Sequence, residues 1–196
     1  DADIVYMNED ASSMFRNINR GAVNMKEIDI SGINTSRVKN MAKMFQADYN
    51  IYEKIIFGDI DTSNVENMSG MFGENYNVKK INLAGLNVKK VRTVTSMFYN
   101  NSSPNQTTLK EINMSGWQLD LVTDLGRLFQ SLIKLESINL SNFSAKNAIS
   151  MSEIFHNCSS LKELNLSTFT IEKVVNMDDA FSDLDSLERI DLSGLN

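Results

Sequence analysis

The sequence predicts an α/β solenoid of about seven repeats, each with one short parallel strand and one short helix. Three observations predict it: a phenylalanine that recurs about every 26 residues, an apolar alternation after each phenylalanine, and an apolar stripe with helical spacing before it. We call this residue the marker phenylalanine. It is found at Phe15, Phe45, Phe72, Phe98, Phe129, Phe155 and Phe181. Such a period is typical of solenoids, because a small unit buries its apolar side only by stacking on its neighbours.

The apolar pattern after each marker phenylalanine predicts a short strand. In the segment 161–169, Leu164 and Leu166 stand two residues apart and point to one face of a strand, while Glu163 and Asn165 point to the other face. The same pattern recurs in all seven repeats. We therefore expect one parallel sheet with a buried face and a solvent-exposed face.

The residues that lead up to the marker phenylalanine predict a short helix in each repeat. Val174, Met177 and Phe181 stand at positions i, i+3 and i+7, which places them on one side of a helix. Ser63, followed three residues later by Glu66, fits a capping box at a helix start. We expect these helices to form a second layer against the sheet.

Length variation falls between the marker phenylalanine and the next strand. The longest insertion, which we place at 99–108, contains Pro104, the only proline of the chain, among several Asn and Ser residues. This composition is typical of turns and loops. It predicts a loop that protrudes from one edge of the solenoid.

Composition excludes several classes of function. The formal net charge of -6 supplies no positive field for a nucleic-acid backbone. One cysteine, Cys158, and one histidine, His156, rule out an intramolecular disulfide and a His-based metal cluster. No apolar run has the roughly 18 residues that a membrane span needs, so we expect no transmembrane segment in this chain.

Cys158 and His156 are the only pair that suggests a nucleophilic enzyme. Cys158, however, occupies the position of Leu132 and Leu184 in other repeats, which favours a small buried core residue. Acidic residues near both ends lack the spacing of a calcium loop. We therefore predict no enzymatic activity, no cofactor and no metal site.

The solvent-exposed face of the predicted sheet carries a row of polar residues, one from each strand. Its members are Asp29, Ile56, Asn82, Asn113, Asn139, Asn165 and Asp191. The row has two interpretations: stacking of side-chain amides along a regular array, which is structural, or a polar strip that recognises a partner. Ile56 interrupts the row and would offer an apolar contact.

Charged residues beside this row mostly alternate in sign from one repeat to the next. They predict a solvated face whose charges pair across neighbouring strands. Lys79, Lys80 and Lys110 are the local exception, because like charges are neighbours there. The predicted partner-binding residues are therefore Ile56, Lys79, Lys80, Asn82, Lys110, Asn113, Asn139 and Asn165.

The repeats at 61–72 (DTSNVENMSGMF) and 151–170 (MSEIFHNCSSLKELNLSTFT) resemble the BspA-like 26-residue repeat of bacterial surface proteins, found in mycoplasmas and lactobacilli. The resemblance covers nearly the whole chain. It implies a leucine-rich-repeat fold, exposure on the cell surface, frequent lipid anchoring, and a role in adhesion or host interaction. It implies no catalytic residues.

These observations together predict a single repeat domain, 1–196, within a longer surface protein anchored through a segment outside this sequence. We expect a non-catalytic binding module outside the cell, which contacts a protein or glycan of a host or neighbouring cell through the sheet face and the 99–108 loop. The alternative is a passive spacer that only extends another domain from the surface.

Overall fold

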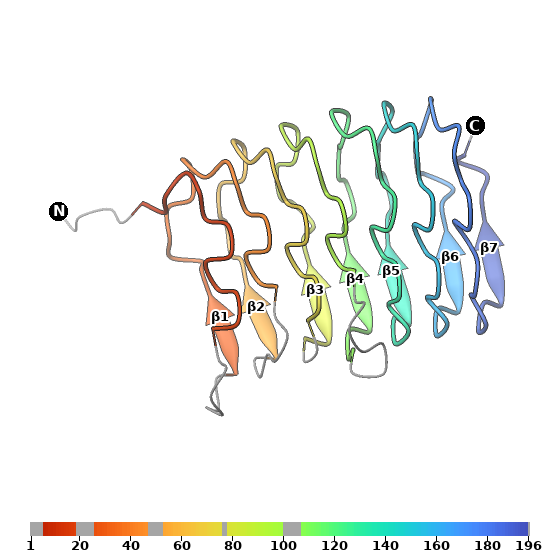
Figure 1. Cartoon of the computed structure of the whole chain (residues 1–196), viewed down its shortest axis with the longest axis horizontal. Helices are drawn as coiled ribbons and strands as arrows, with labels where there is room; N and C mark the ends of the chain where they lie inside the picture. Colours follow the sequence, from red (N-terminus) through yellow and green to blue (C-terminus); the bar gives the residue numbers. More distant parts are fainter. Residues whose placement is uncertain (1–5, 19–25, 47–52, 76–77, 100–106, 196) are drawn as a thin grey trace.

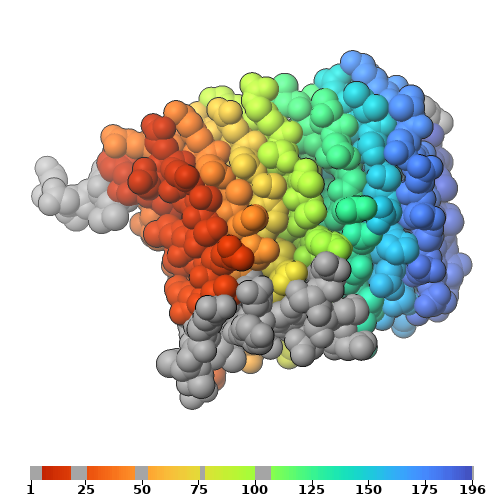
Figure 2. All heavy atoms as spheres, viewed as in Figure 1, coloured from red at the N-terminus to blue at the C-terminus, as the bar shows by residue number. Residues whose placement is uncertain are grey.

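The computed structural model shows a β-solenoid (Figure 1) and describes residues 6–18, 26–46, 53–75, 78–99 and 107–195. Each coil of the solenoid contributes one strand of three residues. The strands are β1 (Glu27–Asp29), β2 (Lys54–Ile56), β3 (Lys80–Asn82), β4 (Glu111–Asn113), β5 (Ser137–Asn139), β6 (Glu163–Asn165) and β7 (Arg189–Asp191). Successive coils follow one another along the long axis as separate bands (Figure 2). The predicted repeat and all seven predicted strands are confirmed.

The strands pair in parallel and in register, so that equivalent residues of successive coils lie side by side. Ile81 pairs with Ile112, which pairs with Ile138 in the next strand. The central residue is buried in β1, β3, β4 and β6, and the two flanking residues are exposed in β1, β3 and β6. In β7, at the end of the array, the central Ile190 is exposed. The polar row predicted from the sequence therefore does lie on the outer face of the sheet.

Two further lines of parallel bridges join the coils away from the strands. One line passes through Gln118, Ser144 and Thr170. The other line has two separate parts, the first through Asp10, Asn40, Asn67 and Thr93 and the second through Asp124, Ser150 and Asn176. The three lines are interrupted at different places: strand pairing stops between β2 and β3 and between β5 and β6, whereas the last line stops between Thr93 and Asp124. Within the described residues, every pair of successive coils from β1 to β7 therefore keeps at least one line.

The predicted helices are wrong, and with them the α/β fold class: no residue that the structure describes is helical. In the segment 38–46, the amides of Met41, Lys43 and Phe45 donate to carbonyls of the next coil at 2.8–2.9 Å. A helix needs those amides for carbonyls four residues back in its own segment. The residue two positions before every marker phenylalanine also has a positive φ, between 51° and 61°, which no α-helix accommodates.

Those left-handed residues occur at the same place in seven coils, and only Gly70 is a glycine. For the other residue types this conformation costs about 1 kcal/mol or more. Interactions with the next coil offset the cost, because the amides of Lys43, Arg127 and Glu153 each donate to a carbonyl there at 2.8–3.0 Å. The apolar residues spaced at i, i+3 and i+7 thus point inward from a succession of tight turns.

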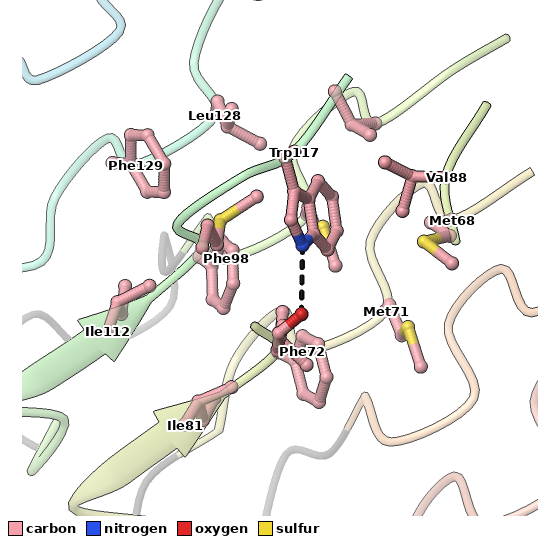
Figure 3. Packing of buried hydrophobic residues seen from close by; sticks show 14 of the residues in the cluster. Met68, Met71, Phe72, Ile81, Val88, Phe98, Ile112, Trp117, Leu128 and Phe129 are labelled. Carbon is pink, nitrogen blue, oxygen red and sulfur yellow. Dashed lines mark hydrogen bonds between the residues drawn. The ribbon is translucent and has the colours of Figure 1, made fainter. Parts of the chain in front are cut away.

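Stacked phenylalanine rings form the centre of the core. The seven marker rings stack in one continuous column, with centroids 5.3–6.1 Å apart and planes within 24° of parallel. A second, shorter stack joins Phe143 and Phe169 at 4.7 Å. Trp117 occupies the equivalent position one coil earlier, fully buried, and its indole Nε1 donates to the Leu83 carbonyl at 2.9 Å (Figure 3). The larger ring is accepted because its only polar group has a partner.

Short polar side chains hold the chain at the corners of each coil. The carboxylate or amide oxygen of an Asp or Asn accepts a hydrogen bond from the amide two residues later, which is an Asx-turn. Such a turn follows each strand that ends in Asn or Asp, for example at Asn113, Asn139 and Asp191, with distances of 3.0–3.1 Å. Asn67 forms the same turn at another corner, at 2.9 Å. Asn and Asp are thus interchangeable as turn formers.

Removing one ring from the interior of the phenylalanine column should destabilise the whole array. We expect Phe72→Ala to lower the free energy of unfolding by about 3–5 kcal/mol, because a fully buried aromatic side chain is lost and its neighbours cannot close the cavity. Phe181→Ala, at the half-buried end of the column, should cost clearly less. Equilibrium denaturation measures both. Equal losses would show that the column does not act as a continuous core.

Acid should weaken the corners formed by aspartate. Hydrogen bonds from Ser31, Ser63 and Ser193 hold the pKa values of Asp29, Asp61 and Asp191 below the ordinary value. Because the folded-state pKa is lower, these carboxylates stabilise the fold above an unfolded pKa near 3.9, and that stabilisation is lost as the pH falls through the folded pKa.

The matched control replaces Asp29, Asp61 and Asp191 with asparagine, which forms the same turn in other coils but does not titrate. We expect the melting temperature of the triple variant to fall less than that of the unmodified chain between about pH 6 and pH 3. Thermal melts across this range measure the difference. Identical acid sensitivity of the two proteins would contradict a role for these carboxylates.

Candidate binding groove

The outer face of the sheet carries a shallow groove of about 380 Å³ across β3, β4 and β5. One wall is the row Lys80, Glu111 and Ser137, and the other is the row Asn82, Asn113 and Asn139. The backbone around the central residues of the three strands lies between them. The groove therefore runs along the solenoid axis and crosses the strands, because equivalent residues of successive coils form each wall.

Each asparagine of this wall uses its side-chain oxygen in a hydrogen bond, whereas its side-chain NH2 group points outward. The Oδ1 atoms of Asn82, Asn113 and Asn139 accept the backbone amides of their turns at 3.1–3.2 Å. Their Nδ2 groups donate no hydrogen bond to any residue that the structure describes. Each side chain therefore presents donors outward, at the strand spacing of roughly 4.8 Å.

The structural role of the asparagine row is thus turn formation. Amide stacking, the structural interpretation drawn from the sequence, would join successive side chains by hydrogen bonds. In the described part of the chain, each Asn of this row instead bonds to a residue of its own turn. Turn formation occupies only the oxygen, so it leaves the amide donors free for a partner.

The two charged residues of the opposite wall form an ion pair between coils, and a second ion pair lies beside the wall. The Lys80 ammonium lies 2.7 Å from the Glu111 carboxylate, and Lys110 lies 2.6 Å from Glu136. The Lys110 hydrogen bond lowers the pKa of Glu136 below its usual value. Of the three lysines predicted to form a basic spot, two are therefore paired. Lys79, just before β3, is exposed and no ion pair involving it is found among the described residues.

The other predicted residues lie outside the groove. Asn165 ends β6, which does not pair with β5, and it forms the same type of turn with Ser167 at 2.9 Å. Ile56 ends β2 and is half-buried, so it offers a smaller apolar surface than expected. Of the predicted 99–108 loop, residues 100–106 lie outside the described residues. The structure therefore brings together Lys80, Asn82, Asn113 and Asn139 out of the predicted set.

Cys158 is a core residue, as its position in the repeat predicts. Its side chain is fully buried, its thiol lies 3.2 Å from the Phe129 carbonyl, and burial raises its pKa to about 12. A thiol with that pKa is almost entirely protonated at neutral pH and is a poor nucleophile. His156 is half-buried, with its Nδ1 atom 3.6 Å from an Asp183 carboxylate oxygen.

Metal-binding clusters and membrane-spanning helices are both absent from the described ranges. No group of three or more His, Cys, Asp or Glu side chains there is arranged to hold a metal ion. Nor does any helix in those ranges have the length and apolar character needed to cross a membrane.

The groove lies on the sheet face that the sequence predicted to be exposed, but its shape was not predicted. Glu111 and Ser137 belong to its wall, and their positions follow from the repeat once the strand register is known. A second concavity, at Gly70 and Gly73, had no signal in the repeat pattern beyond the glycines themselves. It lies on a different side of the coil and shares no residue with the groove.

Comparison with known proteins gives one family. No curated protein and no solved structure matches the chain. A family model described as a mycoplasma protein of unknown function, DUF285, matches residues 9–115 and again residues 104–194. The two matches together span nearly all of the solenoid, from the corner before β1 to the last coil. The chain therefore belongs to this mycoplasma protein family, DUF285.

Proposed function

We propose that this chain is a non-catalytic binding module of the cell surface, which contacts a macromolecule of a host or neighbouring cell through the groove across β3, β4 and β5. One observation carries the proposal: three asparagines, whose amide groups donate to no described residue, lie in register along a concave face. Polar groups that converge on a concavity without internal partners are typical of recognition sites.

The electrostatics of the groove favour a partner without a large net charge. The lysines and glutamates beside the asparagines pair with one another, so neither a strongly anionic nor a strongly cationic partner gains much. Lys79 adds one exposed cation next to the groove. An uncharged or mixed polar surface, as on a protein or a glycan, complements this arrangement best.

The proposed surface location rests on the resemblance of the repeats to those of bacterial surface proteins. The family is one of mycoplasma proteins, and the BspA-like repeats that this chain resembles belong to surface proteins with roles in adhesion. A rigid stack of coils also suits a protein that must present a binding face away from a membrane. The same rigidity would serve a passive spacer, which a cell-binding measurement distinguishes from a binding module.

Replacing Asn113 and Asn139 together with aspartate should weaken binding strongly while leaving the fold intact. Aspartate keeps the turn, as Asp29 and Asp191 show, but replaces each amide donor with an acceptor. We expect at least about a tenfold loss in affinity, since two donors are removed and two repulsive charges are added. Binding of the labelled chain to cultured animal epithelial cells, followed by flow cytometry, measures it.

Asn67→Asp is the matched control, because Asn67 forms the same turn at a corner outside the groove. It should bind as the unmodified chain does. If the unmodified chain binds no better than an unrelated protein, the spacer function is favoured over the binding module. If the double variant binds as well as the control, the groove is not the binding site.

A further inference from the structure

The first and last coils of the described array, formed by residues 6–18 and 170–195, lie at opposite ends of its long axis (Figure 1). In the turns that precede the marker phenylalanine, alternate amides of one coil donate to carbonyls of the following coil. The Phe155 amide, for example, donates to the Ala180 carbonyl at 3.0 Å. This direction gives the two ends of the array different backbone groups: carbonyls at the first coil and amides at the last.

Three backbone amides of the last coil donate no hydrogen bond to any residue that the structure describes. They are the amides of Met177, Asp179 and Phe181. The amides at the same repeat positions one coil earlier all donate to the last coil, at 2.8–3.0 Å, and belong to Met151, Glu153 and Phe155. The last coil therefore presents a row of donors at the positions through which every earlier pair of bonded coils is joined.

The first coil presents the matching acceptors. Within the described residues, no hydrogen bond reaches the backbone carbonyls of Asp10, Ser12 and Met14. The carbonyls at the same repeat positions in the next coil each accept a backbone amide at 2.9 Å, and belong to Asn40, Ala42 and Met44. Donors at one end and acceptors at the other therefore agree in number and in position within the repeat.

Apolar side chains that are buried inside the array are exposed at both ends. Met14 in the first coil is 52% exposed and Met177 in the last coil is 39% exposed. The residues at the same repeat positions in the adjoining coils, Met44 and Met151, are completely buried. The end members of the phenylalanine column are likewise only partly buried. Covering these side chains removes apolar surface from water, which favours association of the two ends.

We propose that the two end coils are an interaction surface for a second copy of this chain, which stacks head to tail. The last coil of one copy donates its three amides to the three carbonyls of the first coil of the next copy, and the phenylalanine columns meet. The contact thus continues the interface that joins coils within the chain. Because two different faces meet, successive copies add in an open row and do not close into a pair. The surface lies apart from the groove across β3, β4 and β5 and does not depend on it.

Sedimentation velocity of the whole chain tests this proposal. The mean mass should rise with concentration between about 1 and about 200 µM and pass that of a dimer. Met14→Glu and Met177→Glu each place a carboxylate in the apolar part of the contact, one at each end, and should weaken association at least about tenfold. Both side chains are exposed in the single chain, so the melting temperatures of the two variants at low concentration should stay close to that of the unmodified chain.

Mixing the two variants distinguishes head-to-tail stacking from other modes of association. Met14→Glu keeps an intact last coil and Met177→Glu keeps an intact first coil, so an equimolar mixture should form a one-to-one dimer and nothing larger.

Leu121→Glu is the matched control, because Leu121 is 44% exposed on the side of an interior coil. It should associate as the unmodified chain does, and so should the Asn113→Asp and Asn139→Asp double variant, which alters only the groove. A chain that stays monomeric throughout, a closed dimer that survives both end variants, a mixture that remains monomeric, or an equal loss in Leu121→Glu would overturn the proposal.

Discussion

The hydrogen bonds between coils are the interaction on which the rest of this structure depends. In the segments between strands, alternate amides such as those of Met41, Lys43 and Phe45 donate to the next coil rather than within their own segment. A coil by itself would leave these groups unpaired and its phenylalanine exposed, and both cost free energy. Stability is therefore a property of neighbouring coils, and the same contacts place equivalent side chains in straight rows.

Those rows explain how residues that stabilise the turns also form a candidate binding surface. Asparagine at a strand end uses its oxygen to form a turn, and repetition of the turn aligns the unused amide groups of Asn82, Asn113 and Asn139. The ion pairs Lys80–Glu111 and Lys110–Glu136 follow from the same register. Departures from the repeat, such as glycine at positions 70 and 73, then create local shape within a uniform array.

The repeat and its strands were predicted from the sequence, but the backbone conformation between the strands was not. The strands and the phenylalanine column follow from spacing, and the outward position of the asparagines follows from alternation. The helices were wrong because Val38, Met41 and Phe45 have the spacing of a helix face and also that of successive tight turns. The decisive left-handed residue is Lys43, Arg127 or Glu153 in some coils, and these residue types do not signal that conformation. The concavity at Gly70 and Gly73 was missed because the segments that line it were predicted to be helical, so their residues were not aligned from coil to coil.

Strand pairing and the two lines of bridges are interrupted at different boundaries between coils, and this affects how the solenoid resists pulling. If strand pairing and both bridge lines stopped at one boundary, pulling on the ends would separate the solenoid there, with only side-chain packing to resist. Instead, the boundaries that lack strand pairing, β2 to β3 and β5 to β6, are held by bridges such as Asn67 to Thr93 and Ser150 to Asn176. Tension along the axis therefore meets backbone hydrogen bonds at each of these boundaries, so the array has no preformed plane of fracture.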